Sequence, residues 1–384
     1  MPLIDAKAAI AALTNIPFQR SWADALQDIE LKREVAGTSK IEGADFTDRE
    51  FEEAVSGQVD ETHLSRSQRQ ARAAISAYKW IAAIPSAQPV TTELIVDIHR
   101  RIVTGCDDDH CQPGALRPAD HNVTFGRPRH RGAIGGIECQ RAFEGLCGAI
   151  QGPFRGHDSL IQAFAAHYHI GAIHPFGDGN GRTARALEAL LLRRSDLKDT
   201  LFIAMSNFYY DEKDEYLRIL SETAANGHVL DDFLSFSLGG LTIQCNRLLK
   251  EIRRNISKVL FRDVMSTMYG RLKSTRKRVL AIRQVKLLEK LLESEKGLSA
   301  QNLMNDLASE YKSLSESEKA FVRDVNQLVG LKAVSVKRDT SSKLVGLAAF
   351  HVSVRLEWPM EVTETSFFAE IEKMPQAKTR LMIG

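Results

Sequence analysis

The stretch AFAAHYHIGAIHPFGDGNGRTARALEALLLRR, residues 163–194, decides the fold of this chain. The part up to His174 and the part from Asn180 onward both place apolar residues three or four positions apart, a period that predicts two helices. Between them, Pro175 ends the first helix and a run of glycine, aspartate and asparagine forms a loop. The sequence therefore predicts a helical domain with its polar side chains gathered at this loop.

The same helical period recurs in residues 21–43 and 93–105, so we expect a mainly α fold. The chain has 384 residues, enough for two or three domains. Its 51 basic and 49 acidic side chains nearly cancel, and the net charge of +2 does not by itself indicate a charged partner.

The sequence carries no recognisable signal for export or for a membrane. The first twenty residues lack a basic start followed by an apolar core, and no run approaches the roughly 20 apolar residues that cross a bilayer. Five cysteines make an odd number without CxxC spacing, which favours reduced thiols. We therefore expect a cytoplasmic protein without membrane contact.

The loop has the composition of an anion site. Gly177, Gly179 and Gly181 alternate with Asp178 and Asn180, and glycine backbone can adopt positive φ and turn its N–H groups inward. A helix begins directly afterwards, and its N-terminus favours negative charge. A phosphate group is the predicted guest.

Arg182 and Arg185 lie three positions apart at the start of that helix and share a face. Cations are unfavourable at a helix N-terminus, so two of them here indicate an anionic partner. Ion pairs with acids elsewhere in the chain are the alternative explanation.

His174 and Asp178 add reactive groups to the loop. An imidazole beside a bound phosphate can take a proton from an incoming nucleophile, although a histidine at a helix end is more often a cap. A carboxylate among phosphates would bind Mg²⁺, although Asp178 could instead only shape the turn.

Two other phosphate or metal chemistries fit less well. His167, His169 and His174 could bind zinc, but their spacing is irregular and no HExxH occurs. The P-loop pattern GxxxxGK[ST] is absent.

The segment resembles the signature HxFx[D/E]GNGRxxR of the Fic (filamentation induced by cAMP) family. All eight fixed positions are filled, by His174, Phe176, Asp178, Gly179, Asn180, Gly181, Arg182 and Arg185. The likeness covers roughly residues 10–245, including SNFYYDEKDEYLRIL at 206–220. It implies a mostly helical enzyme that transfers AMP from ATP to a hydroxyl of a protein.

The resemblance also implies a role for each matched residue. His174 would be the general base for a Ser, Thr or Tyr hydroxyl, and Asp178 would hold Mg²⁺. The α- and β-phosphates of ATP would lie against Gly179, Asn180 and Gly181. The remaining phosphate charge would be neutralised by Arg182 and Arg185.

A second motif lies upstream. TSKIEG, residues 38–43, resembles the family's inhibitory signature [S/T]xxxE[G/N], with Thr38, Glu42 and Gly43 in the fixed places. The resemblance implies that Glu42 pairs with Arg185 and blocks the γ-phosphate, and a carboxylate does compete with phosphate for a guanidinium. Gly43 suits a helix C-cap that would leave Glu42 at the helix tip.

Residues 105–136 are rich in Gly, Pro, Asp and Asn and lack a helical stripe. The resemblance identifies PGALRPADHNVTFG, residues 113–126, with the family's flap, a β-hairpin that receives a segment of the protein substrate as an added strand. Self-modification and a homodimer are also compatible with the sequence.

The C-terminal third differs in charge and pattern. Residues 247–286 hold thirteen Lys or Arg against two acids. Three short helical patterns then precede two β-like runs, at 333–338 and 343–352, which is the order of a winged helix-turn-helix with its recognition helix near 315–329. Such a domain predicts contact with DNA or with another protein.

The predicted organisation has four parts. Residues 1–95 form a helical region with the inhibitory helix, 96–245 the Fic core, 246–278 a basic helical linker and 279–384 the winged-helix-like domain. We expect an autoinhibited protein adenylyltransferase, a nucleotidyltransferase that uses ATP and Mg²⁺. Transfer of another nucleotide, removal of AMP from a modified protein and DNA-binding regulation remain open alternatives.

Overall fold

The computed structural model describes residues 1–16, 20–57, 59–105, 111–195, 202–273, 275–339, 344–373 and 380–383. It divides into two compact units, Met1–Leu249 and Lys250–Gly384. The division falls inside the segment 246–278 that we expected to be a linker, and Phe261, Met265 and Tyr269 of that segment lie in the core of the second unit.

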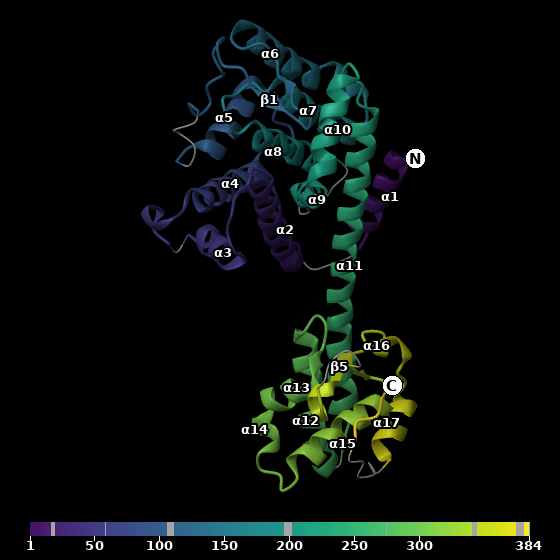
Figure 1. Cartoon of the computed structure of the whole chain (residues 1–384). Helices are drawn as coiled ribbons and strands as arrows, with labels where there is room; N and C mark the ends of the chain where they lie inside the picture. The colour runs from purple at the N-terminus through teal and green to yellow at the C-terminus, as the bar shows by residue number, and fades with distance from the viewer. Residues whose placement is uncertain are drawn as a thin grey trace. The chain divides into compact units, whose positions relative to one another are not determined.

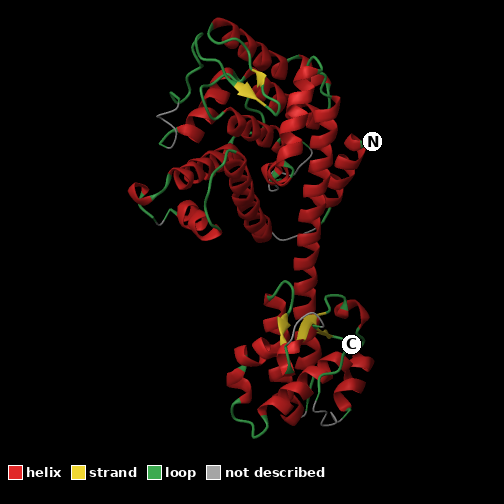
Figure 2. Ribbon diagram, in the orientation of Figure 1, coloured by secondary structure: helices red, strands yellow, loops and turns green. Residues whose placement is uncertain are grey.

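The first unit is almost entirely helical (Figures 1 and 2). Its helices are α1 (Pro2–Thr14), α2 (Arg20–Ile41), α3 (Asp48–Ser56), α4 (Arg66–Ala83), α5 (Thr92–Val103), α6 (Ile137–Gln151), α7 (Ser159–Ile173), α8 (Asn180–Arg193), α9 (Met205–Asp211) and α10 (Lys213–Ala225). The helix α11 (Asp231–Gly270) contributes its first part here, and 3₁₀ turns lie at Glu61–His63 and Pro153–Gly156.

The helices α7 and α8 form the centre of this unit, as the opening stretch predicts. The described side chains of α8 are buried on almost every face, including Leu187 and Leu190, because α2, α4, α5, α7 and α9 pack around it. Figure 1 shows α8 among these helices. The predicted mainly α, Fic-type fold is confirmed, and the catalytic loop lies at the N-terminal end of its most buried helix.

One small sheet interrupts the helices of this unit. The strands β1 (Thr124–Phe125) and β2 (His130–Arg131) pair antiparallel, with Thr124 opposite Arg131 and Phe125 opposite His130. They form the hairpin that we expected within residues 105–136. Residues 106–110 of that range lie outside the described part of the chain.

The second unit combines helices with a three-stranded sheet. After α11 come α12 (Thr275–Glu293), β3 (Leu298–Ser299), α13 (Ala300–Asp306), α14 (Ala308–Tyr311), α15 (Ser317–Gly330), β4 (Val334–Arg338), a 3₁₀ turn (Gly346–Ala349), β5 (Phe350–Val354), α16 (Trp358–Glu361) and α17 (Glu364–Glu372). The strand order is β3-β5-β4, and both pairings are antiparallel. Assignment of this unit as a winged helix stays a prediction.

The second β-like run was predicted at the wrong place. The strand β5 begins at Phe350, and part of the expected strand, Gly346–Ala349, is a 3₁₀ turn. Gly346 has φ +64°, a left-handed conformation that ends extended structure. The two β-like runs lie on either side of a predicted turn at 339–342, of which residues 340–342 lie outside the described part of the chain.

The helix α15, expected to be a recognition helix, is largely buried. The Asn326 side chain donates to the carbonyl of Arg380 (3.0 Å) and accepts from the N–H of Met382 (2.8 Å). Asp324 and Gln327 on the same helix are also buried. The C-terminal segment therefore covers part of α15.

No helix within the described ranges is long and apolar enough to cross a bilayer.

Close packing between α2 and the start of α9 makes Gly37 intolerant of a side chain. A Cβ at Gly37 would lie 2.6 Å from the carbonyl carbon of Ser206. We expect Gly37→Ala to lower the free energy of unfolding by about 1–3 kcal/mol, the usual effect of overpacking, when measured by urea denaturation.

Gly145→Ala is the matched control. Gly145 also lies within a helix, and a Cβ there would meet no atom within 4 Å, so this change should stabilise the protein by a few tenths to about 1 kcal/mol. Equal effects of the two substitutions would contradict the packing of α2 on α9.

Candidate active site

His174 is held at the C-terminal end of α7 in an unusual backbone conformation. Its φ of +54° is left-handed, which turns the chain sharply after Ile173. Its Nδ1 lies 2.8 Å from the carbonyl oxygen of Gly171. Because a carbonyl only accepts, Nδ1 carries the proton and Nε2 of the neutral ring keeps its lone pair. Burial lowers the pKa of His174, which favours this neutral form.

The loop after His174 is closed by the Asn180 side chain. Asn180 Oδ1 accepts from the N–H of Phe176, and Asn180 Nδ2 donates to the carbonyl of Phe176, both at 2.9 Å. The Phe176 ring is fully buried and stacks on His99, with 3.7 Å between the ring centroids. The predicted phosphate-site residue Asn180 thus uses its amide to shape the loop.

His99 holds the backbone carbonyl of Asp178 in place, and the sequence motif does not include this histidine. His99 Nε2 lies 3.0 Å from the Asp178 carbonyl oxygen, and His99 Nδ1 accepts from the N–H of Gly114 at 3.0 Å. Burial lowers the pKa of His99 to about 4, so its ring is neutral. The only sequence signal was a histidine on the apolar face of a helix.

The Asp178 carboxylate is partly exposed and lies among basic groups. Oδ1 accepts from the N–H of Gly179 (2.6 Å), and Arg182 and Arg66 lie 3.8 and 3.9 Å from its two oxygens. No group of three or more His, Cys, Asp or Glu side chains that could hold a metal was found among the described residues. Asp178 is therefore the one carboxylate of this loop that could bind a cation.

Arg117 ties the flap to the catalytic loop. This buried guanidinium donates to the carbonyls of His174 (2.6 Å), His121 (2.8 Å) and Ala133. The Arg117 backbone N–H donates to the carbonyl of Pro175 at 3.0 Å. One side chain from the flap segment thus fixes the backbone that carries the histidine.

The hairpin lies beside the catalytic ring. Phe125 of β1 stacks near His174, with centroids 6.3 Å apart, and the N–H of Ala133 donates to Ile173 at 3.2 Å. The hairpin and the segment after it thus pack against the C-terminal end of α7.

The three glycines of the loop have different roles. Gly179 has φ +73° and forms the N-cap of α8, while Gly177 and Gly181 do not have positive φ. The expected alternating nest is therefore limited to Gly179. Gly181 belongs to the first turn of α8, where a Cβ would lie 2.5 Å from Glu42 Oε1.

The Glu42 side chain lies against the N-terminal turn of α8. Its Oε1 lies 2.5 Å from an Nη of Arg185, and the Arg185 Nε donates to the hydroxyl of Thr38 at 2.8 Å. Burial opposes the charge of Glu42, but Arg185 and Arg182 outweigh it and lower its pKa. An anionic carboxylate thus sits where a phosphate was expected.

The end of α2 places Glu42 there. The helix ends at Ile41, and Gly43 has φ +89°. The N–H of Ala44 donates to the carbonyl of Ser39 at 3.0 Å, the closing bond of a Schellman turn.

Glu34, two turns earlier on α2, docks this helix on the start of α9. Its carboxylate accepts from the N–H of Ser206 (2.7 Å), the Ser206 hydroxyl and the Tyr78 hydroxyl (2.9 Å). Burial raises the pKa of Glu34 to about 7, and these donors only partly oppose it.

His167 belongs to a buried polar network. Its Nδ1 pairs with Glu188 and its Nε2 lies 2.8 Å from the Tyr216 hydroxyl, while Tyr209 donates to Glu188 at 2.9 Å. His169 packs against Tyr168 and Phe154. These contacts, and the absence of a metal cluster in the described ranges, argue against the zinc alternative.

The site and fold together define a class of protein. The helical core combines a helix that ends in a histidine, a short loop closed by an asparagine and a helix that carries arginines. A β-hairpin packs beside them, and this is the arrangement of a Fic domain. Residues 89–192 match the family model of the Fic/DOC family. Over this segment the chain is similar to the Fic/DOC family.

The relatives agree with this assignment. The protein adenylyltransferase Fic of Culex quinquefasciatus is 32% identical over 134 residues, which is 35% of this chain and 25% of that protein. The matching region thus spans about a quarter of that relative's length. A crystal structure of a Fic family protein from Desulfovibrio desulfuricans G20 has a TM-score of 0.56 at 17% identity and covers 92% of this chain and 96% of that one. Fic-1 (residues 134–508) from C. elegans has a TM-score of 0.53 at 17% identity over 66% of this chain and 72% of that chain.

The buried carboxylate of Glu34 makes stability depend on pH. Its pKa is about 7 in the folded chain against an ordinary 4.5. The stability associated with the protonated form is present below pH 4.5 and is lost as the pH rises through about 7. Relative to Glu34→Gln, the free energy of unfolding of the wild type should therefore fall by roughly 3 kcal/mol over this range.

Urea denaturation at pH 5, 6, 7 and 8 measures this difference. Glu53→Gln is the control, because Glu53 is only half-buried on α3 and pairs with Arg49, and it should leave the pH slope unchanged. A wild-type slope identical to that of Glu34→Gln would show that Glu34 titrates near its ordinary pKa.

Proposed function

We propose that this chain is a protein adenylyltransferase that Glu42 holds inactive. The single observation that carries the proposal is the position of the Glu42 carboxylate, 2.5 Å from Arg185 and against Gly181 in the first turn of α8. A phosphate oxygen of a nucleotide would need the same guanidinium and the same helix terminus.

In the proposed reaction, His174 is the general base. The hydroxyl oxygen of the target attacks the α-phosphorus of ATP, and the bond from this phosphorus to the bridging oxygen breaks. Pyrophosphate leaves, and the hydroxyl proton passes to Nε2 of His174. The neutral ring and the hydrogen bond from Nδ1 to Gly171 support this role, because they leave Nε2 basic.

The phosphates would be held by the start of α8. The backbone of Gly179, Asn180 and Gly181 and the guanidinium of Arg182 are grouped there. Arg185 joins them once Glu42 moves away. In-line transfer at phosphorus depends mainly on such positioning and charge neutralisation.

Asp178 would hold Mg²⁺ together with phosphate oxygens and water. One partly exposed carboxylate fits this ion, which commonly keeps several waters and binds through one or two carboxylates. When bound, the ion would neutralise phosphate charge. The flap would orient the protein substrate, and the same geometry allows self-modification.

Glu42→Gly should release the site. Incubated with Mg²⁺, ATP labelled in the α-phosphate and a lysate, this variant should transfer label to protein at least tenfold faster than the wild type, because Arg185 becomes available to phosphate. Glu42→Gly combined with His174→Ala should transfer none. Scintillation counting of precipitated protein gives the rates.

Glu53→Gly is the matched control for loss of a glutamate, and it should label like the wild type. The proposal fails if Glu42→Gly binds ATP yet labels nothing, or if it labels equally well without His174.

Two related reactions use the same residues. The donor could be another nucleotide, or Glu42 could activate a water that removes AMP from a modified protein. Mass spectrometry of the modified protein identifies the added group, and incubation of an AMP-carrying protein with wild type and Glu42→Gly separates transfer from removal.

A second candidate function is contact with DNA through the second unit. The order α12, β3, α13, α15, β4, β5 supports it, as does the basic segment at 247–286. Since α15 is partly covered, the basic residues of α11, such as Arg253 and Arg262, are the better candidates for phosphate contacts.

If DNA binds there, a gel-shift complex should form at low salt and weaken steeply between 50 and 200 mM salt. Arg253→Gln with Arg262→Gln should weaken it at least tenfold, and Arg141→Gln in the first unit should not. No complex at 50 mM salt would exclude this function.

A further inference from the structure

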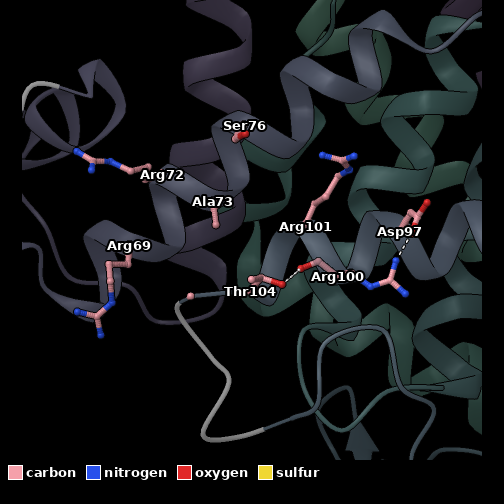
Figure 3. A pocket seen from close by; sticks show the side chains of 9 residues that line it. Arg69, Arg72, Ala73, Ser76, Asp97, Arg100, Arg101 and Thr104 are labelled. Atoms are coloured by element: carbon pink, nitrogen blue, oxygen red, sulfur yellow. Dashed lines mark hydrogen bonds and ion pairs between the residues drawn. The ribbon is translucent and has the colours of Figure 1, made fainter. Parts of the chain in front are cut away.

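A cleft between α4 and α5 lies outside the catalytic site. Its volume is about 540 Å³. The lining residues, drawn in Figure 3, are Arg69, Arg72, Ala73 and Ser76 of α4 and Asp97, Arg100, Arg101, Thr104 and Gly105 of α5 and its end.

The charge of this lining is strongly unbalanced. Among the described lining residues, four are arginines and one, Asp97, is a carboxylate that pairs with Arg100. Arg69 donates to the carbonyl of Leu64 at 2.9 Å, a neutral partner.

The remaining two guanidinium groups also have neutral contacts. Arg72 donates to the carbonyls of Val59 (2.7 Å) and Ala54 (2.9 Å), with Asp60 near it outside the cleft. Arg101 lies over the ring of Trp80, 4.2 Å from its centroid. Carbonyls and a ring hold the side chains in place without removing the positive charge.

Small residues make the hollow between these arginines. Ala73, Ser76, Thr104 and Gly105 occupy the space where α4 and α5 face each other, and Figure 3 shows Ala73 and Thr104 between the arginine side chains. The volume is in the range of small-molecule sites, roughly 300–1,000 Å³.

We propose that this cleft binds a small molecule that carries two or more phosphate groups. Guanidinium groups bind phosphate oxygens in pairs of hydrogen bonds, and a ligand with several phosphate groups offers such oxygens to more than one arginine. The arginines come from two helices and are spread around the hollow, so one phosphate cannot reach all of them. The ligand would relieve the repulsion among them.

The helix α5 separates this cleft from the catalytic loop. His99 and Val103 on one face contact the loop at Asp178 and Gly179. Arg100, Arg101 and Thr104, on the other side of the same two turns, line the cleft. A ligand in the cleft would therefore act on the helix that supports Asp178. The binding site itself does not depend on the proposed transfer reaction, because binding is measured without turnover.

Titration calorimetry with inorganic tripolyphosphate on the full chain tests the proposal. In the wild type, where Glu42 pairs with Arg185, we expect one binding site for tripolyphosphate. Arg100→Gln combined with Arg101→Gln should raise its Kd at least tenfold, and Arg141→Gln, an exposed arginine on α6, should leave it unchanged. Glu42→Gly should add a second site that the cleft substitutions do not remove.

Ser76→Glu is the second variant, in case the arginine substitutions disturb folding. Ser76 is exposed on α4, so this change adds a carboxylate to the cleft and keeps every arginine. It should also weaken binding at least tenfold. The proposal is overturned if wild type does not bind tripolyphosphate, if the Kd is unchanged in both variants, or if a hexa-aspartate peptide binds more tightly than tripolyphosphate.

Discussion

The burial of Arg185 is the constraint on which the site depends. This side chain is only 2% exposed, and a guanidinium removed from water needs hydrogen-bonding partners and a counter-charge. Thr38 on α2 and Glu42 directly after it supply them, and both residues are far from Arg185 in the sequence. The ion pair therefore joins the end of α2 to α8, and it occupies the guanidinium that the proposed reaction assigns to a nucleotide.

The remainder of α2 is arranged to keep that pair in place. Glu34 binds the start of α9 through Ser206, and Gly37 allows the backbones to approach closely. Both contacts lie on the helix that ends directly before Glu42, so the docking of α2 sets the position of the carboxylate. Release of Glu42 could occur by rotation of its own side chain, which is 35% exposed, without undocking the helix.

The loop between α7 and α8 is held by a separate set of contacts. Asn180 closes this short loop, His99 supports it, and Arg117 links it to the flap. These three residues contact backbone atoms, so they determine where His174 and Asp178 point. Arrangements of this kind hold reacting groups in position before a substrate arrives.

Local sequence determined much of this protein. Helical periodicity predicted α7 and α8, and the motif brought His174, Asp178, Arg182 and Arg185 to one loop because they are neighbours in the chain. Periodicity could not locate the start of β5, since Gly346 interrupts a run that is otherwise β-like.

Only the tertiary structure decided which distant groups meet. Whether Glu42 reaches Arg185 depends on the packing of α2, and the roles of His99 and Arg117 depend on carbonyls that no side-chain pattern encodes. The arginine cleft arises in the same way, because its two halves lie on different helices. Spacing in a sequence reports neighbours along one element, whereas a hydrogen bond or a cavity between elements requires both of them in place.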